Sequence, residues 1–257
     1  MLVAICSAKG SPGVTATALT LAATWPRRVV LLEADPSGGD LVYRCRAGSG
    51  GWLHSAPNLL TLAAAIRGGI PRSSVVAENS QRLGCGVDLV PGVTAPTQAR
   101  GLSGLWTMLA QACQGAEVDV IADLGRLDRA GAALPVAEAA DSVLTVASST
   151  LESVMHLREG LGPLLGALNA HQGATVVPVI VGTDSQAARD CADIDELLAT
   201  AGLPVQGAQH LPYDPKALDR LEHGESADGR LGRTLLIRAG RAMSASILER
   251  AGEAVST

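Results

Sequence analysis

The sequence predicts an α/β fold in which a single doubly wound, mostly parallel sheet carries helices on both faces. Short runs rich in β-branched residues alternate with longer Ala/Leu-rich segments, the pattern of parallel strands joined by helical crossovers. The chain has 257 residues, 47% hydrophobic and 18% charged, which suits one well-buried domain. Because no linker-like stretch separates two apolar blocks, we expect residues 1–257 to form one domain.

Seven short runs are predicted to be the strands of this sheet, enough for one doubly wound domain. In chain order they are 2–8 (LVAICSA), 28–35 (RVVLLEAD), 86–92 (GVDLVPG), 118–125 (VDVIADLG), 142–148 (SVLTVAS), 175–182 (TVVPVIVG) and 204–212 (PVQGAQHLP). The Gly- and Ser-rich stretch 45–58 (CRAGSGGWLHSAPN) is predicted to be a surface loop.

Composition excludes several classes of protein. A net charge of −5 and a pI near 5.5 argue against a dedicated nucleic-acid binder, which needs a basic surface. The five cysteines are far apart and form no C-x-x-C pair, so we expect reduced, mostly buried thiols rather than disulfides or a zinc site. The five histidines show no ligand spacing. No leader pattern and no apolar run of about 18 residues is present, so a cytoplasmic location is predicted.

The stretch 9–15 (KGSPGVT) directly follows the first predicted strand. Gly10 and Gly13 allow backbone conformations that turn successive N–H groups inward, and a helix beginning near Thr15 adds the positive end of its dipole. These features predict an anion site. A phosphate-binding P-loop also carries a lysine just before the Ser/Thr that ligates Mg²⁺, and here Val14 occupies that place while Thr15 keeps the hydroxyl. By itself, the stretch fits a phosphate site and a strand-to-helix turn that binds nothing equally well.

Two acidic segments follow in the order and spacing of a known family. The stretches 28–41 (RVVLLEADPSGGDL) and 118–126 (VDVIADLGR), together with 9–15, resemble the deviant Walker A ATPases of the ParA/MinD kind, and the resemblance covers most of the chain. It implies that Lys9 reaches across a face-to-face dimer to the nucleotide of the other subunit. Glu33 takes the first acidic place of the family's D-x-D-P, Asp35 matches the aspartate that positions the attacking water, and Asp123 matches the Walker B aspartate of the Mg²⁺ shell.

Three further segments extend the resemblance. The stretches 58–71 (NLLTLAAAIRGGIP) and 86–92 are similar to the segments between these motifs in MinD-like proteins, and 143–161 (VLTVASSTLESVMHLREGL) is similar to their following strand, turn and helix. The stretch 210–218 (HLPYDPKAL) resembles the loop that closes over adenine, which implies base contacts by Pro212, Tyr213 and Asp214.

Several residues depart from the family pattern. Val14 lacks the charged group that acts within the subunit, Pro12 lacks an N–H donor, and Ala16 lacks a second hydroxyl. Gly182 and Thr183 stand where the family has an Asn before the base. A small residue also replaces the second lysine in the CpaE/TadZ-like proteins that localise secretion or pilus machinery, and the sequence is most similar to that subgroup.

The candidate carboxylates also have a purely structural interpretation, because short polar residues often end strands and cap helices. Asp35 and Asp123 both lie at the carboxyl ends of predicted strands, however, and ligands of open α/β sheets bind outside those ends. We therefore expect the two carboxylates and the Gly-rich loop to converge on one site.

The sequence thus predicts an ATP-binding, dimer-forming protein that acts as a positioning or assembly switch for a larger machine, with weak or absent hydrolysis. The predicted nucleotide contacts are Lys9, Gly10, Ser11, Pro12, Gly13, Val14, Thr15, Ala16, Pro212, Tyr213 and Asp214; the predicted catalytic residues are Lys9 and Asp35, and the predicted Mg²⁺ ligands are Thr15 and Asp123. The alternative is a pseudo-ATPase scaffold that binds partners but no nucleotide. A metabolic ligase or kinase is disfavoured, because no substrate-binding set accompanies the loop.

The last 25 residues show apolar positions at helical spacing, including Leu235, Leu236 and Met243. Because Glu249 and Glu253 accompany Arg250, we expect a packed terminal helix rather than a basic membrane-seeking one, and no stable membrane insertion. The predicted partners are a second copy of the chain in the ATP state and a protein of the machine being positioned. A DNA-binding patch of Arg233, Arg238 and Arg241 stays open beside a solvated helix face.

Overall fold

The computed structural model describes residues 1–10, 12–168 and 174–255. Within these residues, eight strands form one sheet in the order β3-β4-β2-β5-β1-β6-β7-β8. The strands are β1 (Leu2–Ser7), β2 (Val29–Glu33), β3 (Gln81–Arg82), β4 (Asp88–Val90), β5 (Asp119–Arg126), β6 (Ser142–Ser148), β7 (Thr175–Gly182) and β8 (Gln209–Pro212). All neighbours pair in parallel except β3 and β4, which are antiparallel. The predicted fold class and all seven predicted strands are confirmed, and only the two-residue edge strand β3 was not predicted.

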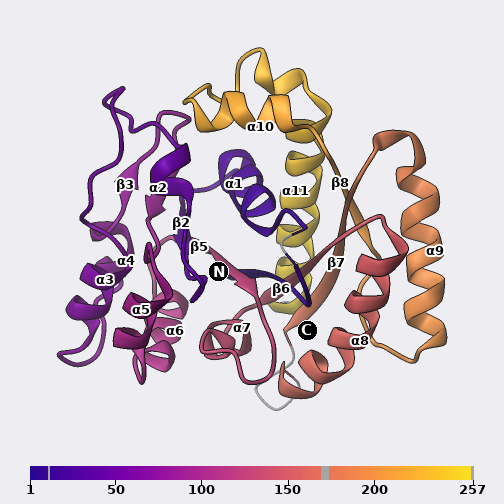
Figure 1. Cartoon of the computed structure of the whole chain (residues 1–257), viewed down its shortest axis with the longest axis horizontal. Helices are drawn as coiled ribbons and strands as arrows, with labels where there is room; N and C mark the ends of the chain where they lie inside the picture. The colour runs from indigo at the N-terminus through magenta and orange to yellow at the C-terminus, as the bar shows by residue number, and fades with distance from the viewer. Residues whose placement is uncertain (11, 169–173, 256–257) are drawn as a thin grey trace.

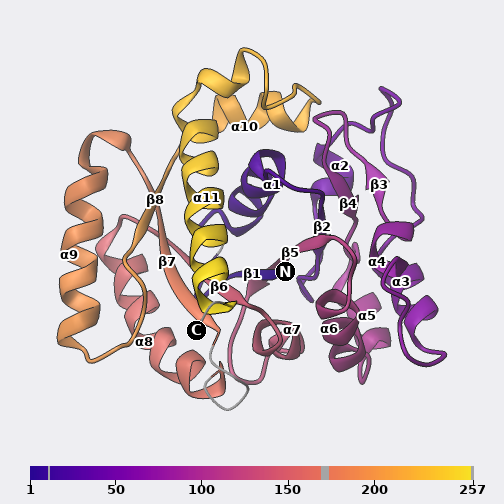
Figure 2. The same cartoon turned by 180° about the vertical axis from the view of Figure 1, so that it is seen from behind.

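The helices lie on both faces of this sheet, as Figures 1 and 2 show from opposite sides. They are α1 (Val14–Thr24), α2 (Leu41–Arg44), α3 (Leu59–Ile66), α4 (Val75–Glu78), α5 (Pro96–Ala99), α6 (Trp106–Gln114), α7 (Leu134–Glu138), α8 (Leu151–Leu168), α9 (Ala187–Thr200), α10 (Pro215–Glu222) and α11 (Leu235–Val255). Short 3-10 turns occupy Arg100–Leu102, Asp184–Gln186 and Leu231–Arg233.

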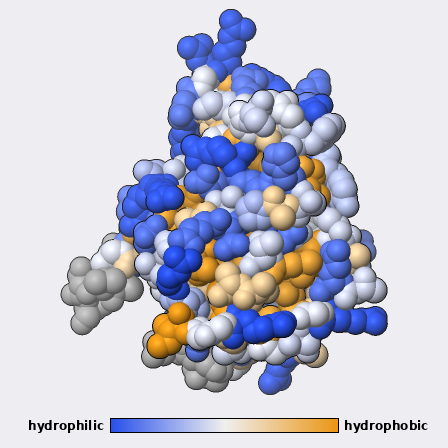
Figure 3. Space-filling model, turned by 90° about the vertical axis from the view of Figure 1, so that its left-hand side faces the viewer, coloured by the Kyte–Doolittle hydropathy of each residue, from blue (hydrophilic) through white to orange (hydrophobic). Residues whose placement is uncertain are grey.

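The sheet and its helices pack together through two apolar cores, one on each face of the sheet. Alternate residues of β1 point to opposite faces, so Val3 and Ile5 join the core under α1, α10 and α11, whereas Leu2, Ala4 and Cys6 join the core under α3, α4 and α6–α9. Because both faces are covered, the central strands are continuous hydrophobic runs rather than alternating ones. Figure 3 views the molecule from the side of α3 and α4, where hydrophilic side chains cover much of the surface and hydrophobic patches show between them.

The terminal helix α11 packs as predicted. It runs beside α1 (Figures 1 and 2), and its residues Leu236, Ile237, Met243 and Ile247 are buried. A Cβ at Gly240 would stand 2.9 Å from side-chain atoms of Thr20 and Thr24, so glycine permits this close approach. In contrast to its predicted place on the apolar stripe, Leu235 is 47% exposed, because it opens the helix beyond the core.

The three arginines of the candidate DNA patch have different surroundings. Arg233 and Arg238 are exposed, whereas Arg241 donates to the carbonyl oxygens of Ala227 (2.8 Å) and Gly232 (3.4 Å). Arg241 therefore holds the loop before α11. Within the described residues, no helix combines the length and the hydropathy that crossing a bilayer requires. All five cysteines are free thiols, four of them buried, as predicted.

Candidate functional site

The candidate site lies at the carboxyl edge of the central strands. β2, β5 and β1 are neighbours in the sheet, and because they are parallel, the segments that follow them emerge at the same edge. Asp35 follows β2, Asp123 lies on β5 beside Ile5 of β1, and the Gly-rich loop follows β1. The expected convergence of loop and carboxylates is therefore present in the structure.

The loop leads directly into α1. Gly10 and Gly13 have φ of 74° and 99°, which side chains other than glycine rarely adopt. The Ser7 hydroxyl donates to the Gly10 carbonyl (3.0 Å), and the Gly13 carbonyl accepts from the Thr17 amide (2.8 Å). Gly13, the N-cap residue of α1, has no side chain to cap the helix, so among the described residues the N–H groups of its first turn are left to an external acceptor. Ser11, one of the predicted contacts, lies outside the described residues.

Val14 stands where a P-loop has its lysine, and the structure uses it as a core residue. Its side chain is only 3% exposed and belongs to the apolar core under α1. Burial of a side chain of this size stabilises the fold by about 1.5 kcal/mol. The chain therefore presents no ammonium group at this position.

Thr15 and Asp123 form the central polar pair of the site. The Thr15 hydroxyl donates to Asp123 Oδ2 at 2.6 Å, and the Gly125 amide donates to Asp123 Oδ1 at 3.0 Å. Burial and, to a smaller extent, the nearby Asp35 raise the pKa of Asp123 to about 6, against the lowering effect of these two hydrogen bonds. The carboxylate is therefore mostly ionised at pH 7.

Asp35 lies against the backbone that follows Asp123. Its Oδ1 accepts from the Ser37 amide at 2.7 Å. A Cβ at Gly125, whose φ is 60°, would stand 1.8 Å from Asp35 Oδ2, so the carboxylate occupies the space that any larger residue would need. Burial raises the pKa of this half-buried carboxyl above its usual range. Gly125, which lies on β5 two residues after Asp123, thus lets Asp35 and Asp123 come close together.

Glu33 has a structural role that sequence reasoning did not identify. Its side chain is 2% exposed, and its two oxygens accept from the amides of Leu41 and Gly92, each at 3.0 Å. Burial raises its pKa to about 7. Glu33 therefore ties the start of α2 to the loop after β4, and it does not contact the Gly-rich loop through these bonds.

Lys9 is exposed at the start of the loop, and its ammonium makes no ion pair with any described residue. Pro12, Thr15 and Ala16 are half-buried around the first turn of α1. Directly behind the loop, α8 packs closely, since a Cβ at Gly160 would stand 2.6 Å from the Ala8 Cβ.

The segment predicted to contact adenine lies at the ends of β7 and β8, on the α1 side of the loop. Gly182 pairs with Pro212, and a Cβ at Gly13 would stand 3.6 Å from Val181. Tyr213 is 70% exposed. Asp214 caps α10, because its Oδ1 accepts from the Ala217 amide at 3.0 Å. The observed contact of Asp214 is thus that of a helix cap.

These groups fit a magnesium–phosphate ligand in their donor chemistry. The uncapped first turn of α1 offers N–H donors, and a hydroxyl and a carboxylate supply the hard oxygen atoms that Mg²⁺ prefers. No group of three or more His, Cys, Asp or Glu side chains that could hold a metal occurs among the described residues. This donor set suits an ion that is bound largely through phosphate and water.

Comparison with known proteins identifies the fold. No family model and no curated protein sequence matches the chain. A ParA family ATPase from Chlorobium tepidum superposes with a TM-score of 0.70 at 18% identity, covering 95% of this chain and 97% of that one. The complex of a McdA variant with ATP from Cyanothece gives 0.68 at 20%, covering 96% of each chain.

A third solved structure is the septum site-determining protein MinD complexed with Mg-ADP from Pyrococcus horikoshii. It superposes with a TM-score of 0.64 at 14% identity and covers 98% of this chain and 97% of that one. Because the likeness extends over nearly the whole length of every chain, the fold is that of the ParA/MinD P-loop ATPases.

Proposed function

We propose that this chain is an ATP-binding, dimer-forming protein that acts as a positioning or assembly switch for a larger cellular machine. The observation that carries the proposal is the Thr15–Asp123 hydrogen bond of 2.6 Å beside the uncapped start of α1. It supplies a hydroxyl and a carboxylate beside free backbone donors. The named nucleotide and metal ligands of the McdA and MinD structures support ATP and Mg²⁺ as the ligands.

In this proposal the loop and the first turn of α1 hold the phosphates, and Thr15 and Asp123 hold Mg²⁺. The ion, when bound, supplies positive charge that offsets that of the phosphates. Pro212 and Tyr213 lie beside the base, and the Asp35 carboxylate, held by the Ser37 amide and by its packing on Gly125, orients a water molecule. Selection of adenine over other bases falls to this exposed Tyr213 and the backbone near it.

Weak or absent hydrolysis follows from Val14. Loss of a cation that clamps developing phosphoryl charge commonly costs several kcal/mol of barrier. The exposed Lys9 is the cation nearest in sequence to the loop, and we propose that it contacts the nucleotide of the opposite subunit. ATP binding and dimerisation are then coupled, as in a switch that positions other proteins in the cytoplasm, and the CpaE/TadZ-like proteins are the proposed subgroup.

The alternative is a scaffold that keeps the fold and a partner surface but binds no nucleotide. Calorimetry with ATP and ADP, each with and without Mg²⁺, separates the two functions. We expect Mg²⁺-dependent binding of ATP, weakened at least tenfold in Asp123→Asn, because a neutral amide is a poorer Mg²⁺ ligand. Asp193→Asn on the exposed face of α9 is the matched control. No heat with any nucleotide at millimolar concentration would favour the scaffold.

Sedimentation of the wild type, Lys9→Ala and Asp35→Ala with and without Mg²⁺ and ATP tests the cross-subunit contact. A charge-assisted contact is worth about 1.5–3 kcal/mol, or roughly tenfold to a hundredfold in affinity. Lys9→Ala should weaken ATP binding and ATP-dependent dimerisation together, as linkage requires, whereas Asp35→Ala should spare both. A wild type whose association ignores ATP contradicts the mechanism.

A further inference from the structure

Strand β5 carries a bulge directly after Asp123. Ile5 and Ser7 of β1 are two residues apart, whereas their register partners on β5, Asp123 and Arg126, are three residues apart. The extra length of β5 includes Gly125, whose φ is 60°. Bulges of this kind change the direction of a side chain and are over-represented beside active sites. The bulge therefore decides which face of the sheet receives Arg126.

That face is the one that carries the Gly-rich loop and α1. In a regular strand, Asp123 and Arg126 would point to opposite faces, because successive side chains alternate. With the bulge, both are partners of residues on one face of β1, the face on which Ile5 joins the core under α1. Leu124 and Leu127 both join the opposite core, as this arrangement requires. Arg126 thus lies on the same face of the sheet as the Asp123 carboxylate.

The register partner of Arg126 is also the residue from which the loop departs. The Ser7 carbonyl accepts from the Leu127 amide at 3.0 Å, and the Ser7 hydroxyl donates to the Gly10 carbonyl at 3.0 Å. Neighbouring strands of a sheet lie about 4.8 Å apart, so Arg126 begins one strand spacing from the start of the loop. Its long, exposed side chain can therefore reach an anion that the loop holds.

The Arg126 guanidinium is available for such an anion. It forms neither an ion pair nor a hydrogen bond with any of the residues that the structure describes. The same edge of the sheet carries the carboxylates of Asp35 and Asp123, and a triphosphate would add further negative charge that one Mg²⁺ offsets only in part. A guanidinium suits this place, because its planar set of donors matches phosphate oxygens in pairs.

The order of groups along β5 indicates which phosphate lies within reach. The proposed Mg²⁺ ligand Asp123 precedes Arg126, and in P-loop enzymes this ion bridges the β- and γ-phosphates. Arg126 is the last residue of the strand, beyond Asp123 and at the outer edge of the sheet. The terminal phosphate is therefore the group that we expect the guanidinium to meet.

We propose that Arg126 binds the terminal phosphate of ATP within its own chain and supplies part of the positive charge that Val14 lacks. This contact is separate from the one proposed for Lys9, which crosses to the opposite subunit. It rests on the proposed function, because it needs a nucleotide at the loop. The backbone donors and the Mg²⁺ ligands are unchanged in an Arg126 variant, so such a variant should still bind ADP.

The test is calorimetry of the wild type and of variants with Mg²⁺–ATP and with Mg²⁺–ADP. Arg126→Gln is expected to lower the affinity for ATP about tenfold or more, as the loss of a charge-assisted contact does, and to leave the affinity for ADP nearly unchanged. Arg126→Lys should recover part of the loss, because lysine keeps the charge without the planar donors. Arg126 is exposed, so we expect both variants to fold.

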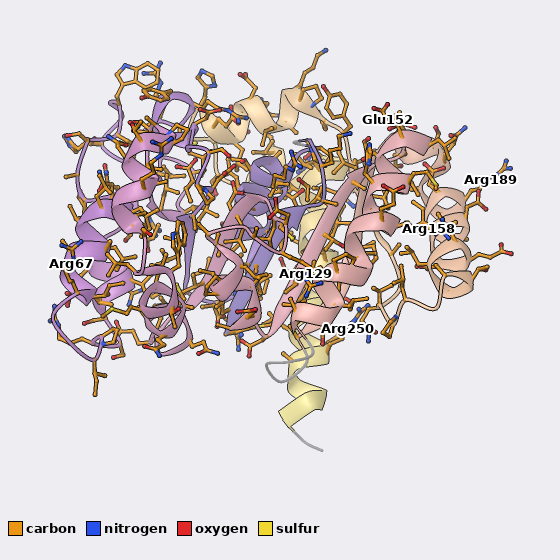
Figure 4. All side chains as sticks on the ribbon, turned by 60° about the horizontal axis from the view of Figure 1, so that its bottom comes forward. Arg67, Arg129, Glu152, Arg158, Arg189 and Arg250 are labelled. Carbon is orange, nitrogen blue, oxygen red and sulfur yellow. The ribbon has the colours of Figure 1, made fainter. Side chains whose placement is uncertain are left out.

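Two other arginines supply matched controls. Arg129 follows in the same segment, but it lines a small cavity with Gly160 and Leu164 of α8, on the opposite face of the sheet. In Figure 4 it lies near the middle of the view, whereas Arg189 of α9 lies at the right-hand edge. Arg129→Gln and Arg189→Gln remove the same charge as Arg126→Gln, and both should bind ATP nearly as the wild type does.

A second measurement needs no variant. Phenylglyoxal modifies accessible guanidinium groups, and mass spectrometry of peptides follows the modification of each arginine. Mg²⁺–ATP should slow the modification of Arg126 severalfold, and Mg²⁺–ADP should slow it much less. Arg189 should react at the same rate in all conditions.

Three outcomes would overturn the contact while the wild type binds ATP. They are equal ATP affinity in Arg126→Gln and wild type, an equal loss in Arg129→Gln, and a modification rate of Arg126 that ignores ATP. A loss in Arg126→Gln that is equal for ADP and ATP would overturn the assignment to the terminal phosphate. A wild type that binds no nucleotide would overturn the proposed function and this contact with it, so the two failures are distinguishable.

Discussion

Glu33 and Asp123 occupy matching places in two neighbouring regions of the molecule. They are register partners on β2 and β5, both are 2% exposed, and burial raises the pKa of both. Glu33 nevertheless accepts from two backbone amides, whereas Asp123 accepts from one amide and from the hydroxyl of Thr15. A hydroxyl can exchange its partner for a metal ion, and a backbone amide cannot. Although burial and register are equal, the Glu33 carboxylate thus has a structural role, whereas the Asp123 carboxylate is available for a ligand.

The largest expected effect separates the two regions by stability. Glu33→Ala leaves two buried amides without an acceptor and should lower the free energy of unfolding by about 3–6 kcal/mol. Asp123→Ala should cost only about 1–2 kcal/mol, because it orphans one buried amide and Thr15 can turn to solvent. Urea denaturation without nucleotide measures both. Equal losses in the free energy of unfolding would show that Asp123 has the same structural role as Glu33.

The glycines that pack against the two acidic regions sharpen the comparison. A Cβ at Gly39 would stand 2.6 Å from the Glu33 carboxylate carbon. Because this carboxylate cannot move without breaking its hydrogen bonds to Leu41 and Gly92, Gly39→Ala should lower the free energy of unfolding by about 2–4 kcal/mol. Gly125→Ala should cost about 1–3 kcal/mol, from its positive φ and its clash with Asp35.

Thermal unfolding of both variants checks these values. Because Asp35 is half-buried and can turn away, combining Gly125→Ala with Asp35→Ala should recover at least about 0.5 kcal/mol of the loss. Strict additivity of the two substitutions would contradict the close packing of Asp35 on Gly125.

A cation placed beside Asp123 should raise the affinity of the candidate site for its proposed ligand, Mg²⁺–ATP. In Val14→Lys the apolar stem can stay in the core while the ammonium extends toward the loop, so we expect Mg²⁺–ATP to bind about tenfold more tightly. Turnover should rise as well, and stability should fall by about 1–2 kcal/mol. Calorimetry and phosphate release measure the changes, with Val14→Met separating charge from side-chain size. A matching gain in Val14→Met would show that charge is not the missing element.

The smallest expected effect is a difference in pH dependence. The pKa of Glu33 rises from its usual 4.5 to about 7 in the folded chain, so the native state holds a proton that the unfolded chain has lost. Its contribution to stability is complete below pH 4.5 and is lost as the pH rises through about 7. The stability of the wild type relative to Glu33→Gln should therefore fall by about 1–2 kcal/mol between pH 5 and pH 7.

Asp123 should give a slope of the same sign at lower pH, because its pKa rises from 3.8 to about 6. Urea midpoints of the wild type, Glu33→Gln and Asp123→Asn across this range make the comparison. A wild type that gains stability over Glu33→Gln as the pH rises would contradict the burial of that carboxyl.

Much of the fold was predictable because its signals are local. Runs such as 142–148 and 175–182 are short stretches rich in β-branched residues, and the structure has strands over those same residues. β3 was missed because two residues, Gln81 and Arg82, show no hydrophobic pattern and pair only through their neighbour β4. Its antiparallel pairing depends on the turn at Gly86, not on propensity.

The residues of the site could be predicted from the sequence, but the contacts that each residue makes were harder to predict. The loop, Asp35 and Asp123 were expected to converge because parallel strands end at one edge, and they do. Glu33 and Asp214 are also acidic residues at or just after strand ends, yet Glu33 joins the start of α2 to the loop after β4 and Asp214 caps α10.

By itself, the sequence determined the sheet, the edge of the sheet at which the candidate site residues lie, and the presence of valine instead of lysine at position 14. These depend on hydrophobic periodicity, on the common direction of parallel strands and on residue identity, all of which can be read along the chain. Only the tertiary structure decided which buried carboxylate is free to exchange its partner, because that depends on whether Leu41 and Gly92 or Thr15 lie within hydrogen-bond reach. Such contacts join residues up to 108 positions apart, and packing places them there.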